Sequence, residues 1–415
     1  MSDNENLFAH FYKKFPTDLS RPLLLTPEGQ RVSYAEADRA TSKIANYLQD
    51  LGAKKGDRIS VLVEKSVENL LLYLGCLKSG LVYHPMNIGY QTTEVSYMLE
   101  DAEPTIIICS KNQKSIVESL LPAKRAKAIL TLEYDGTGTL MEGCSTYSEN
   151  AAISICDAKD MAALLYSSGT TGKPKGIMLS HKNLSSNAKA LSKVWGFSNE
   201  DRLLHALPIY HVHGLFIALG PVLLTGASMS WHTRFDVDSV MRTLIECTVM
   251  MGVPTYYTRL LDNPKLDPEY CKNMRVFICG SAPLLPEIFK EFEIRTGHPI
   301  LERYGMTETG INASNPLAGK RIAGSVGQAL PGMKAQIVDD AGKVVRPGET
   351  GNLQVKGDNV FSGYWKMPEK TAQDFTSDGF FNTGDKAIIN KQGYISIVGR
   401  SKDMIISGGL NIYPR

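Results

Sequence analysis

Short apolar runs alternate with segments of helical periodicity over about the first 320 residues. The helical spacing is clearest at residues 67–78 and in the segment that follows Asp236, while Ser33 and Glu36 make a capping-box pattern ahead of a helix that stops at Gly52. Apolar runs of strand length occupy residues 59–63, 105–109, 161–166, 202–206, 249–253 and 275–279. The alternation predicts βαβ units with mainly parallel sheets, and because the series occurs twice we expect two stacked α/β subdomains.

The pattern changes at about residue 325. Residues 335–338 and 352–356 alternate apolar and polar positions, and Ala341-Gly342 and Gln392-Gly393 stand where hairpin turns belong. This predicts a small, mostly antiparallel, barrel-like β subdomain. We therefore expect an α/β fold divided into residues 1–165, 166–324 and 325–400, with a hinge segment at 401–415.

Composition narrows the class of protein. The 415 residues are 43% hydrophobic and 21% charged, with a formal net charge of +2, so no strong field attracts nucleic acid or an anionic membrane. The longest apolar stretch, residues 70–77, is too short to span a bilayer. The seven scattered cysteines form no CxxC pair, and the polar start of the chain is unlike a signal peptide. We expect a cytoplasmic protein that is a monomer or homodimer, with no nucleic-acid or membrane partner.

The strongest chemical signal is the loop at residues 166–176, which reads Tyr-Ser-Ser-Gly-Thr-Thr-Gly-Lys-Pro-Lys-Gly. Its glycines let several backbone N–H groups face one anion, its hydroxyls add donors, and its two lysines add charge. The loop therefore suits a polyphosphate. It is not the P-loop of kinases, because Pro174 follows Lys173 where that motif needs Ser or Thr opening a helix.

This loop resembles the signature of the adenylate-forming superfamily, which includes acyl-CoA synthetases, nonribosomal adenylation domains and luciferases. The resemblance extends over essentially the whole chain, because four further motifs follow in the family's order. They begin at Gly280-Ser281-Ala282-Pro283, Tyr304-Gly305-Met306-Thr307-Glu308, Thr383-Gly384-Asp385 and Gly399-Arg400-Ser401-Lys402-Asp403.

The resemblance implies that ATP, Mg²⁺ and coenzyme A take part, and it assigns roles to residues. Glu308 and Thr170 would hold Mg²⁺, Asp385 would accept the ribose hydroxyls, and Lys402 would be the hinge pivot; Thr307, Glu308, His211 and Lys175 would be catalytic. The remaining nucleotide contacts would be Ser167, Ser168, Gly169, Thr171, Gly172, Lys173, Gly280, Ser281, Ala282, Tyr304, Gly305 and Arg400, with Thr170 and Asp385 among them. Adenylation builds charge on the α-phosphate and on pyrophosphate, which fixed donors and a metal ion must meet.

The acid is indicated less directly. The segment 207–214 matches the family's acyl-pocket segment, with His211 near the carboxylate and Met306 in the pocket, although a histidine in an apolar stretch can be purely structural. Residues 251–261, 281–285 and 295–308 resemble malonyl-CoA synthetases, and the first and last of these segments contain Arg259 and Arg303. Since a buried second carboxylate needs a charged partner, we predict that Arg259, together with Arg303, binds the distal carboxylate of malonate or methylmalonate. Each arginine could instead make an ordinary ion pair.

Members of the family carry a further domain after the hinge, whose late lysine bridges acid and phosphate. Nothing follows Arg415 in this sequence. We therefore expect the chain to be the ATP- and acid-binding part of the enzyme, with weak adenylation and essentially no CoA ligation by itself.

Two other interpretations remain. The chain could be a short-chain synthetase or an amino-acid adenylation domain, in which case Asp236 would be the residue to meet an α-amine, although an N-cap role fits its position better. It could also be an inactive nucleotide-binding module, against which stand the retained Thr307, Glu308, Asp385 and Arg400. A kinase lacks both the P-loop sequence and a base for a hydroxyl acceptor.

Overall fold

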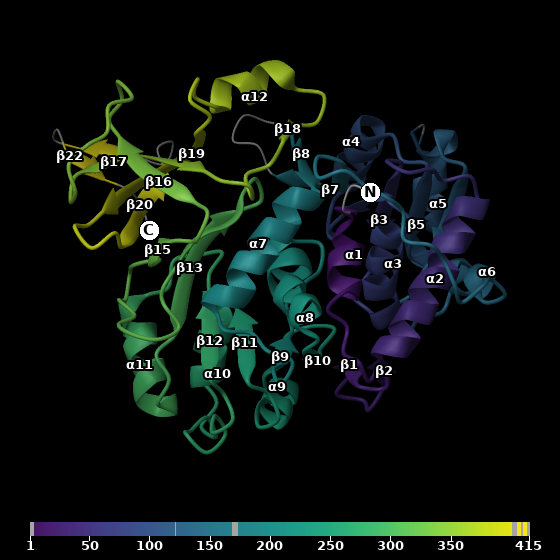
Figure 1. The fold of residues 1–415 in the computed structure, drawn as a ribbon, viewed down its shortest axis with the longest axis horizontal. Coiled ribbons are helices and arrows are strands. Elements are labelled where there is room, and N and C mark those ends of the chain that lie inside the picture. The colour runs from purple at the N-terminus through teal and green to yellow at the C-terminus, as the bar shows by residue number, and fades with distance from the viewer. Residues whose placement is uncertain (1–3, 121, 168–172, 401–404, 408–409, 413–415) are drawn as a thin grey trace.

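The described residues form two large sheets, a four-stranded sheet and a two-stranded one (Figure 1). The computed structural model describes residues 4–120, 122–167, 173–400, 405–407 and 410–412; positions 122 and 124 and those beyond 400 are described by backbone alone. The predicted α/β fold with mainly parallel sheets and a small antiparallel subdomain is confirmed.

The first large sheet has seven strands within the described residues, in the order β18-β8-β7-β4-β3-β5-β6. Its central strands are parallel, while β8 runs antiparallel to β7. The strands are β3 (Arg58–Leu62), β4 (Val82–Pro85), β5 (Ile106–Cys109), β6 (Ala128–Thr131), β7 (Met161–Ser167), β8 (Lys175–Ser180) and β18 (Gly363–Tyr364). The edge strand β18 arrives from far along the chain.

The second large sheet has nine strands in the part of the chain that the structure describes, in the order β15-β14-β13-β12-β11-β9-β10-β1-β2. They are β1 (Pro22–Leu25), β2 (Arg31–Ser33), β9 (Arg202–His205), β10 (Ser228–Trp231), β11 (Val249–Gly252), β12 (Val276–Cys279), β13 (Leu301–Met306), β14 (Gly310–Ser314) and β15 (Gln328–Ala329). The N-terminal hairpin β1–β2 thus belongs to the sheet built mainly from residues 202–329. The two sheets interlock, and the boundaries at 165, 324 and 400 stay a prediction.

Helices lie on the outer faces and between the sheets. Helix α1 packs against α3, α7 and α8, and α7 packs against α8. Together α7 and α8 form the layer of helices at the centre of Figure 1. The helices are α1 (Leu7–Tyr12), α2 (Tyr34–Asp50), α3 (Val67–Lys78), α4 (Thr92–Ala102), α5 (Lys111–Ser119), η1 (Pro122–Arg125), α6 (Thr139–Cys144), α7 (His181–Val194), η2 (His213–Ala218), α8 (Leu219–Thr225), α9 (Val237–Leu244), α10 (Pro254–Leu261), α11 (Pro286–Thr296) and α12 (Pro368–Asp374).

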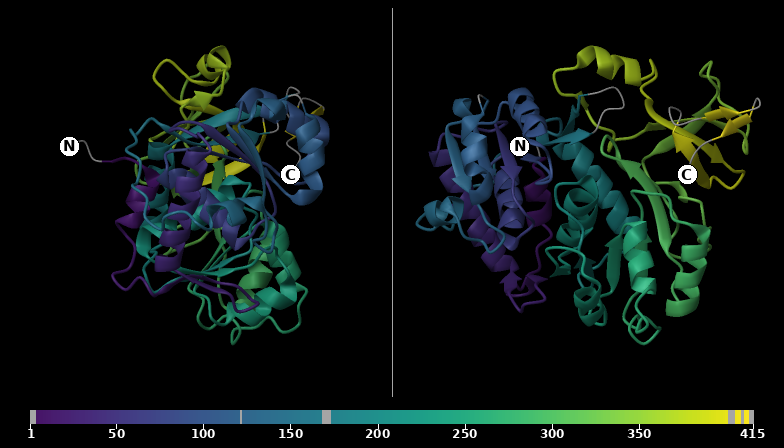
Figure 2. Two further views of the ribbon diagram at one scale, coloured as in Figure 1. Left: turned by 90° about the vertical axis from the view of Figure 1, so that its right-hand side faces the viewer. Right: turned by 180° about the vertical axis from the view of Figure 1, so that it is seen from behind.

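A four-stranded antiparallel sheet follows in the order β16-β17-β19-β20, and β21 pairs with β22 beyond it. The bounds are β16 (Lys334–Val338), β17 (Thr350–Lys356), β19 (Phe381–Ile389), β20 (Ile395–Arg400), β21 (Ile405–Ser407) and β22 (Leu410–Ile412). Figure 2 shows this sheet and α12 at the same end of the molecule, beyond the end of β13. Motifs that are distant in sequence can therefore meet at that end.

Local signals in the sequence are borne out. The capping box of Ser33 and Glu36 starts α2, and the Asp236 carboxylate accepts the backbone N–H of Ser239 at 2.9 Å as the N-cap of α9. Both predicted hairpin turns place glycine at a positive φ, +82° at Gly342 and at Gly393, where a side chain would be strained. Among the described helices, none combines the length and the apolar character needed to cross a membrane.

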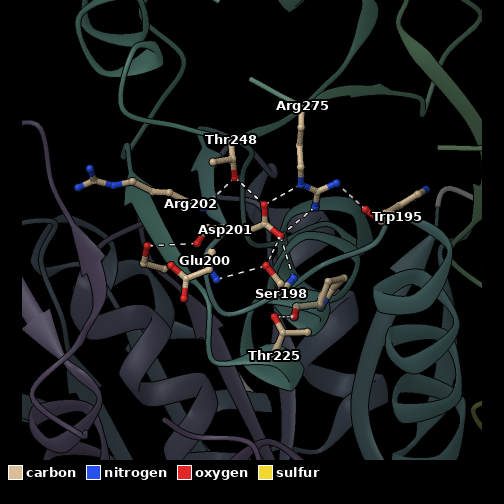
Figure 3. A network of polar contacts seen from close by, with 10 residues as sticks. Trp195, Ser198, Glu200, Asp201, Arg202, Thr225, Thr248 and Arg275 are labelled. Carbon is tan, nitrogen blue, oxygen red and sulfur yellow. Dashed lines mark hydrogen bonds and ion pairs between the residues drawn. The ribbon is translucent and has the colours of Figure 1, made fainter. Parts of the chain in front are cut away.

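An ion pair joins the strands of the nine-stranded sheet at the ends where β9 and β12 begin (Figure 3). Arg275 donates to both carboxylate oxygens of Asp201 at 2.7 and 2.9 Å and to the Trp195 carbonyl at 2.7 Å, while Thr248 donates to the same carboxylate at 2.7 Å. Asp201 is buried, so this network satisfies a charge that would otherwise be costly. It lies at the opposite strand ends from the motifs described next.

Candidate active site

The predicted phosphate-binding loop falls between two paired strands. Ser167 ends β7 and pairs with Lys175, which starts the antiparallel strand β8. Tyr97 donates to the Pro174 carbonyl at 3.1 Å, and the Lys173 ammonium lies 5.4 Å from the centre of the Tyr97 ring. The predicted contacts Ser168, Gly169, Thr170, Thr171 and Gly172 lie outside the described residues, as does Lys402.

Lys175 starts β8 in one large sheet and Glu308 follows β13 in the other, and their charges interact. The Lys175 ammonium lies 4.9 Å from the centre of the Tyr364 ring, and its charge acts on Glu308. Burial raises the pKa of Glu308, while Lys175 and Arg400 oppose that shift by favouring the carboxylate. The Glu308 carbonyl also accepts the Phe361 N–H at 2.7 Å, which fixes the backbone next to β18.

Glu308 fits the metal role that the resemblance implies. Its carboxylate is buried and forms no ion pair within the described segments, and a cation would meet the charge that burial disfavours. Mg²⁺ commonly takes one or two carboxylates and completes its shell with phosphate oxygens and water. Among the described residues, no group of three or more acidic, histidine or cysteine side chains is arranged to hold a metal ion. Nucleotide phosphates would complete the shell of a Mg²⁺ ion on Glu308.

The predicted adenine and ribose residues converge from the large and the small sheet. Tyr304 on β13 donates its hydroxyl to the Asp385 carboxylate on β19. Asp385 faces Arg400 across β19 and β20, with 3.8 Å between the Arg400 Nε and an Asp385 oxygen. The Thr383 hydroxyl accepts the Asp385 N–H at 3.1 Å and anchors the turn. Three motifs from separate parts of the sequence thus meet at one place.

A second polar group surrounds Arg303, next to the predicted adenine segment. Its side chain is 5% exposed, it donates to the Ser281 hydroxyl at 3.4 Å, and its Nε has no hydrogen-bond partner in the described structure. The Ser281 hydroxyl also lies 3.2 Å from Nδ1 of His213, whose Nε2 is unpartnered in the same described set. Burial lowers the pKa of Arg303 to about 10, so the guanidinium remains charged at neutral pH.

The backbone here accommodates the arginine. A Cβ at Gly280 would lie 2.6 Å from the Arg303 guanidinium carbon, so only glycine leaves room for it. Ser281 follows with a φ of +73°, an unusual conformation for a non-glycine residue, which aims its hydroxyl between His213 and Arg303. Ala282 is exposed beside them.

The other predicted acid-site residues lie in different settings. Arg259 is exposed on α10, with its guanidinium carbon 5.0 Å from the centre of the Phe235 ring, and His211 is exposed with its ring against Tyr210. Met306 is half-buried at the end of β13; Gly305 and Thr307, also half-buried, flank it. Within the described residues, Arg259 makes no hydrogen bond or ion pair with the group around Arg303. The roles of all these site residues stay a prediction.

A cavity of about 780 Å³ opens between the two large sheets beside residues 207–214, which we call the acyl segment. Pro208, Ile209 and Tyr210 line one side, Phe235 and Tyr256 continue that side, and the ends of β3 and β4 face them. Phe235 stacks on Tyr256 with 3.9 Å between the ring centres. The acyl segment therefore lies between this cavity and the group around Arg303.

His213 and Tyr364 are contacts that the sequence did not single out. His213 is buried and bonded to Ser281, whereas His211, two residues earlier, is exposed. The apolar residues after His213 gave a usable signal, because they predict that the chain turns inward there. Tyr364 had no signal, since its place beside Lys175 depends on the pairing of β18 with β8.

Comparison with known proteins identifies the family. Residues 13–365 match the family model described as AMP-binding enzyme. ATP-bound MatB from Rhodopseudomonas palustris superposes with a TM-score of 0.96 and 46% sequence identity, covering 99% of this chain and 82% of that one. A malonate–CoA ligase from Arabidopsis thaliana is 31% identical over 94% of this chain and 70% of its own length. A sulfoacetate–CoA ligase from Cupriavidus necator is 31% identical over 95% of this chain and 78% of its own length.

The fold and the convergence of its motifs define an adenylate-forming protein. The chain belongs to the AMP-binding enzyme family. It is an acid–thiol ligase that uses ATP and coenzyme A as substrates.

Proposed function

We propose that the acid this ligase activates is a small dicarboxylate, malonate or methylmalonate, and that Arg303 binds its distal carboxylate. The observation that carries the proposal is the buried guanidinium of Arg303, which forms no ion pair within the described residues. A buried charge without a partner is costly, so a protein that retains one has a use for it. An acid with a second carboxylate supplies the missing partner.

The surroundings favour a short acid with two charges. Burial lowers the pKa of His213, so it is neutral and offers a hydrogen bond rather than a charge. The Ser281 hydroxyl stands between His213 and Arg303. Arg303 is thus the charged member of this polar group, and its planar guanidinium can bind a carboxylate through two parallel hydrogen bonds. Arg259, exposed on α10, is a weaker candidate for the same role.

The ATP-binding residues would act by positioning and charge. Mg²⁺ held by Glu308 would neutralise charge that develops on the phosphates. Lys175 carries positive charge beside Glu308, so it would act near the same phosphates, while Tyr304 and Asp385 would hold the nucleoside. Thr307, between the nucleoside and metal residues in sequence, would contact the α-phosphate.

Relatives with doubly charged acids support the proposal, because malonate and sulfoacetate are named as substrates of similar ligases. The amino-acid alternative loses its main candidate, since the Asp236 carboxylate is engaged as a helix N-cap. A short-chain monocarboxylate remains the competing substrate. Such an acid would leave Arg303 buried and unpaired.

Acid-dependent exchange between ATP and pyrophosphate tests the proposal. The panel contains malonate, methylmalonate, sulfoacetate, acetate and octanoate, with Mg²⁺ present. We expect malonate or methylmalonate to support the highest kcat/KM. Higher values with acetate or octanoate would refute the dicarboxylate assignment. A preference for sulfoacetate would mean that the substrate carries two negative charges but is not a dicarboxylate.

We also infer a cytoplasmic location and a monomeric or homodimeric state without nucleic-acid or membrane partners. All seven cysteines are buried as free thiols, which suits a reducing compartment. Fractionation and light scattering of the protein would test these inferences.

A further inference from the structure

Lys65 is a buried lysine that the predicted chemistry does not use. It follows β3 in the loop before α3, its side chain is 8% exposed, and it lines the cavity between the two large sheets. It has no carboxylate partner among the described residues. A lysine removed from water in this way needs other partners for its N–H groups.

The partners of Lys65 come from the opposite sheet. Its Nζ lies 2.8 Å from Nδ1 and 2.9 Å from the carbonyl oxygen of His205, the last residue of β9. It also lies 4.1 Å from the centre of the Trp231 ring at the end of β10. Two acceptors and one aromatic face satisfy the three N–H groups of an ammonium. Lys65 therefore ties the seven-stranded sheet to the ends of two strands in the nine-stranded sheet.

His205 extends this contact toward the acyl segment. Its Nε2 lies 2.9 Å from the Gly214 carbonyl oxygen. Since a carbonyl only accepts, Nε2 must carry the proton. Nδ1 of a neutral ring is then an acceptor, and burial lowers the pKa of His205, which keeps the ring neutral. Lys65 must donate to that nitrogen, whether it is an amine or an ammonium.

Gly214 stands where the acyl segment turns back on itself. A Cβ at Gly214 would lie 2.1 Å from the Pro208 carbonyl oxygen, so the two ends of the segment are in close contact. The preceding residue is His213, which contacts Ser281 beside Arg303. A continuous series of contacts therefore runs from Lys65 through His205 and Gly214 to the proposed acid site.

We propose that Lys65 is a positioning residue for the acid: by donating to His205 it fixes the tautomer that holds the Gly214 carbonyl, and so sets the place of His213. This inference rests on the proposed function of the same site. Loss of the Lys65 contact should displace the acyl segment and leave the predicted ATP-binding residues on β13 and β19 in place. Small displacements of a positioning group commonly cost one to two orders of magnitude in rate.

The variant Lys65→Met tests this with Lys78→Met as matched control. Lys78 is a buried lysine of the same α/β unit, and its side-chain partners, Asp38 at 2.7 Å and Ser42, belong to α2 and not to β9. In pyrophosphate exchange, we expect K65M to lower kcat/KM for the acid on the order of 10- to 100-fold, with the KM for ATP unchanged. K78M should lower Tm without changing the KM for the acid. Equal effects of the two variants on the acid would overturn the proposal.

Imidazole ¹⁵N spectra of the wild-type protein give a second test that does not depend on a variant folding. His205, assigned by comparison with H205Q, should be protonated at Nε2 and unprotonated at Nδ1. A proton on Nδ1 would overturn the proposal. If malonate does not support pyrophosphate exchange by the wild-type protein, that result refutes the proposed function and not the role of Lys65. The K65M variant would then be compared with the wild type on the acid that the wild type prefers.

Discussion

Replacing Arg303 by methionine should weaken dicarboxylate activation without weakening the fold. Burial lowers the pKa of this guanidinium from its ordinary value to about 10, which corresponds to a penalty of about 3 kcal/mol on the charged form. Both values lie above 7, so the group is charged in the folded and unfolded states, and the whole penalty is present at neutral pH. Methionine removes the charge, so we expect the free energy of unfolding to stay equal or rise by up to about 3 kcal/mol.

Arg275→Met makes the same chemical change with the opposite expectation. Arg275 donates to both oxygens of the buried Asp201 carboxylate (Figure 3). Breaking a buried pair on one side typically costs about 3–5 kcal/mol, because the other charge is left without a partner. Urea unfolding of the wild type and both variants should therefore separate R303M from R275M by several kcal/mol.

In substrate preference we expect R303M, and not R275M, to differ from the wild type. Removing one partner of a buried charge pair costs about 2–5 kcal/mol of binding, so R303M should lose at least about 30-fold in kcat/KM for malonate. Its already low activity on acetate should change much less. R275M should keep the substrate preference of the wild type at temperatures where it is folded. Equal losses of R303M on malonate and acetate, or destabilisation equal to that of R275M, would refute the reasoning.

Three further substitutions test the metal role of Glu308, the buried Glu302 and the N-cap Asp236. Glu308→Gln should lower Mg²⁺-dependent pyrophosphate exchange by about 100-fold or more while leaving Tm within a few degrees of the wild type; unchanged exchange would remove its metal role. Burial raises the pKa of Glu302 to about 7. Because the folded state then keeps its proton to higher pH than the unfolded state, the free energy of unfolding should fall as pH rises from about 4.5 to 7. Glu302→Gln should flatten that part of the curve measured by urea unfolding, and a variant curve identical to the wild-type one would contradict the raised pKa of Glu302. Asp236→Ala should cost about 1 kcal/mol through loss of the N-cap and leave the acid preference intact, whereas a changed preference would restore the amino-acid alternative.

The fold was largely predictable because its signals are local. Helix α3 begins and ends at the predicted residues, and strands β3, β5, β7, β9, β11 and β12 agree with the apolar runs within one or two residues. Pairing between distant segments was not predictable. The hairpin β1–β2 joins the second large sheet and β18 joins the first, since edge strands of two to four residues leave no periodic pattern.

The candidate site divides in the same way. The motifs located Tyr304, Glu308 and Asp385 by resemblance, and the structure brings Tyr304 and Asp385 into contact. The sequence indicated Arg259 together with Arg303 and could not choose between them, because it carries no information about burial at two isolated arginines. Lys65 and His205 are 140 residues apart, and neither belongs to a motif, so their contact became visible only when the two sheets were placed together.

Co-crystallisation with Mg²⁺, a non-hydrolysable ATP analogue and malonate tests the central claim most directly. We expect triphosphate density between β7 and β8, a metal ion on Glu308, and one malonate carboxylate within hydrogen-bonding distance of the Arg303 guanidinium. Malonate bound elsewhere, with Arg303 still lacking an anionic partner, would show that Arg303 does not bind the acid.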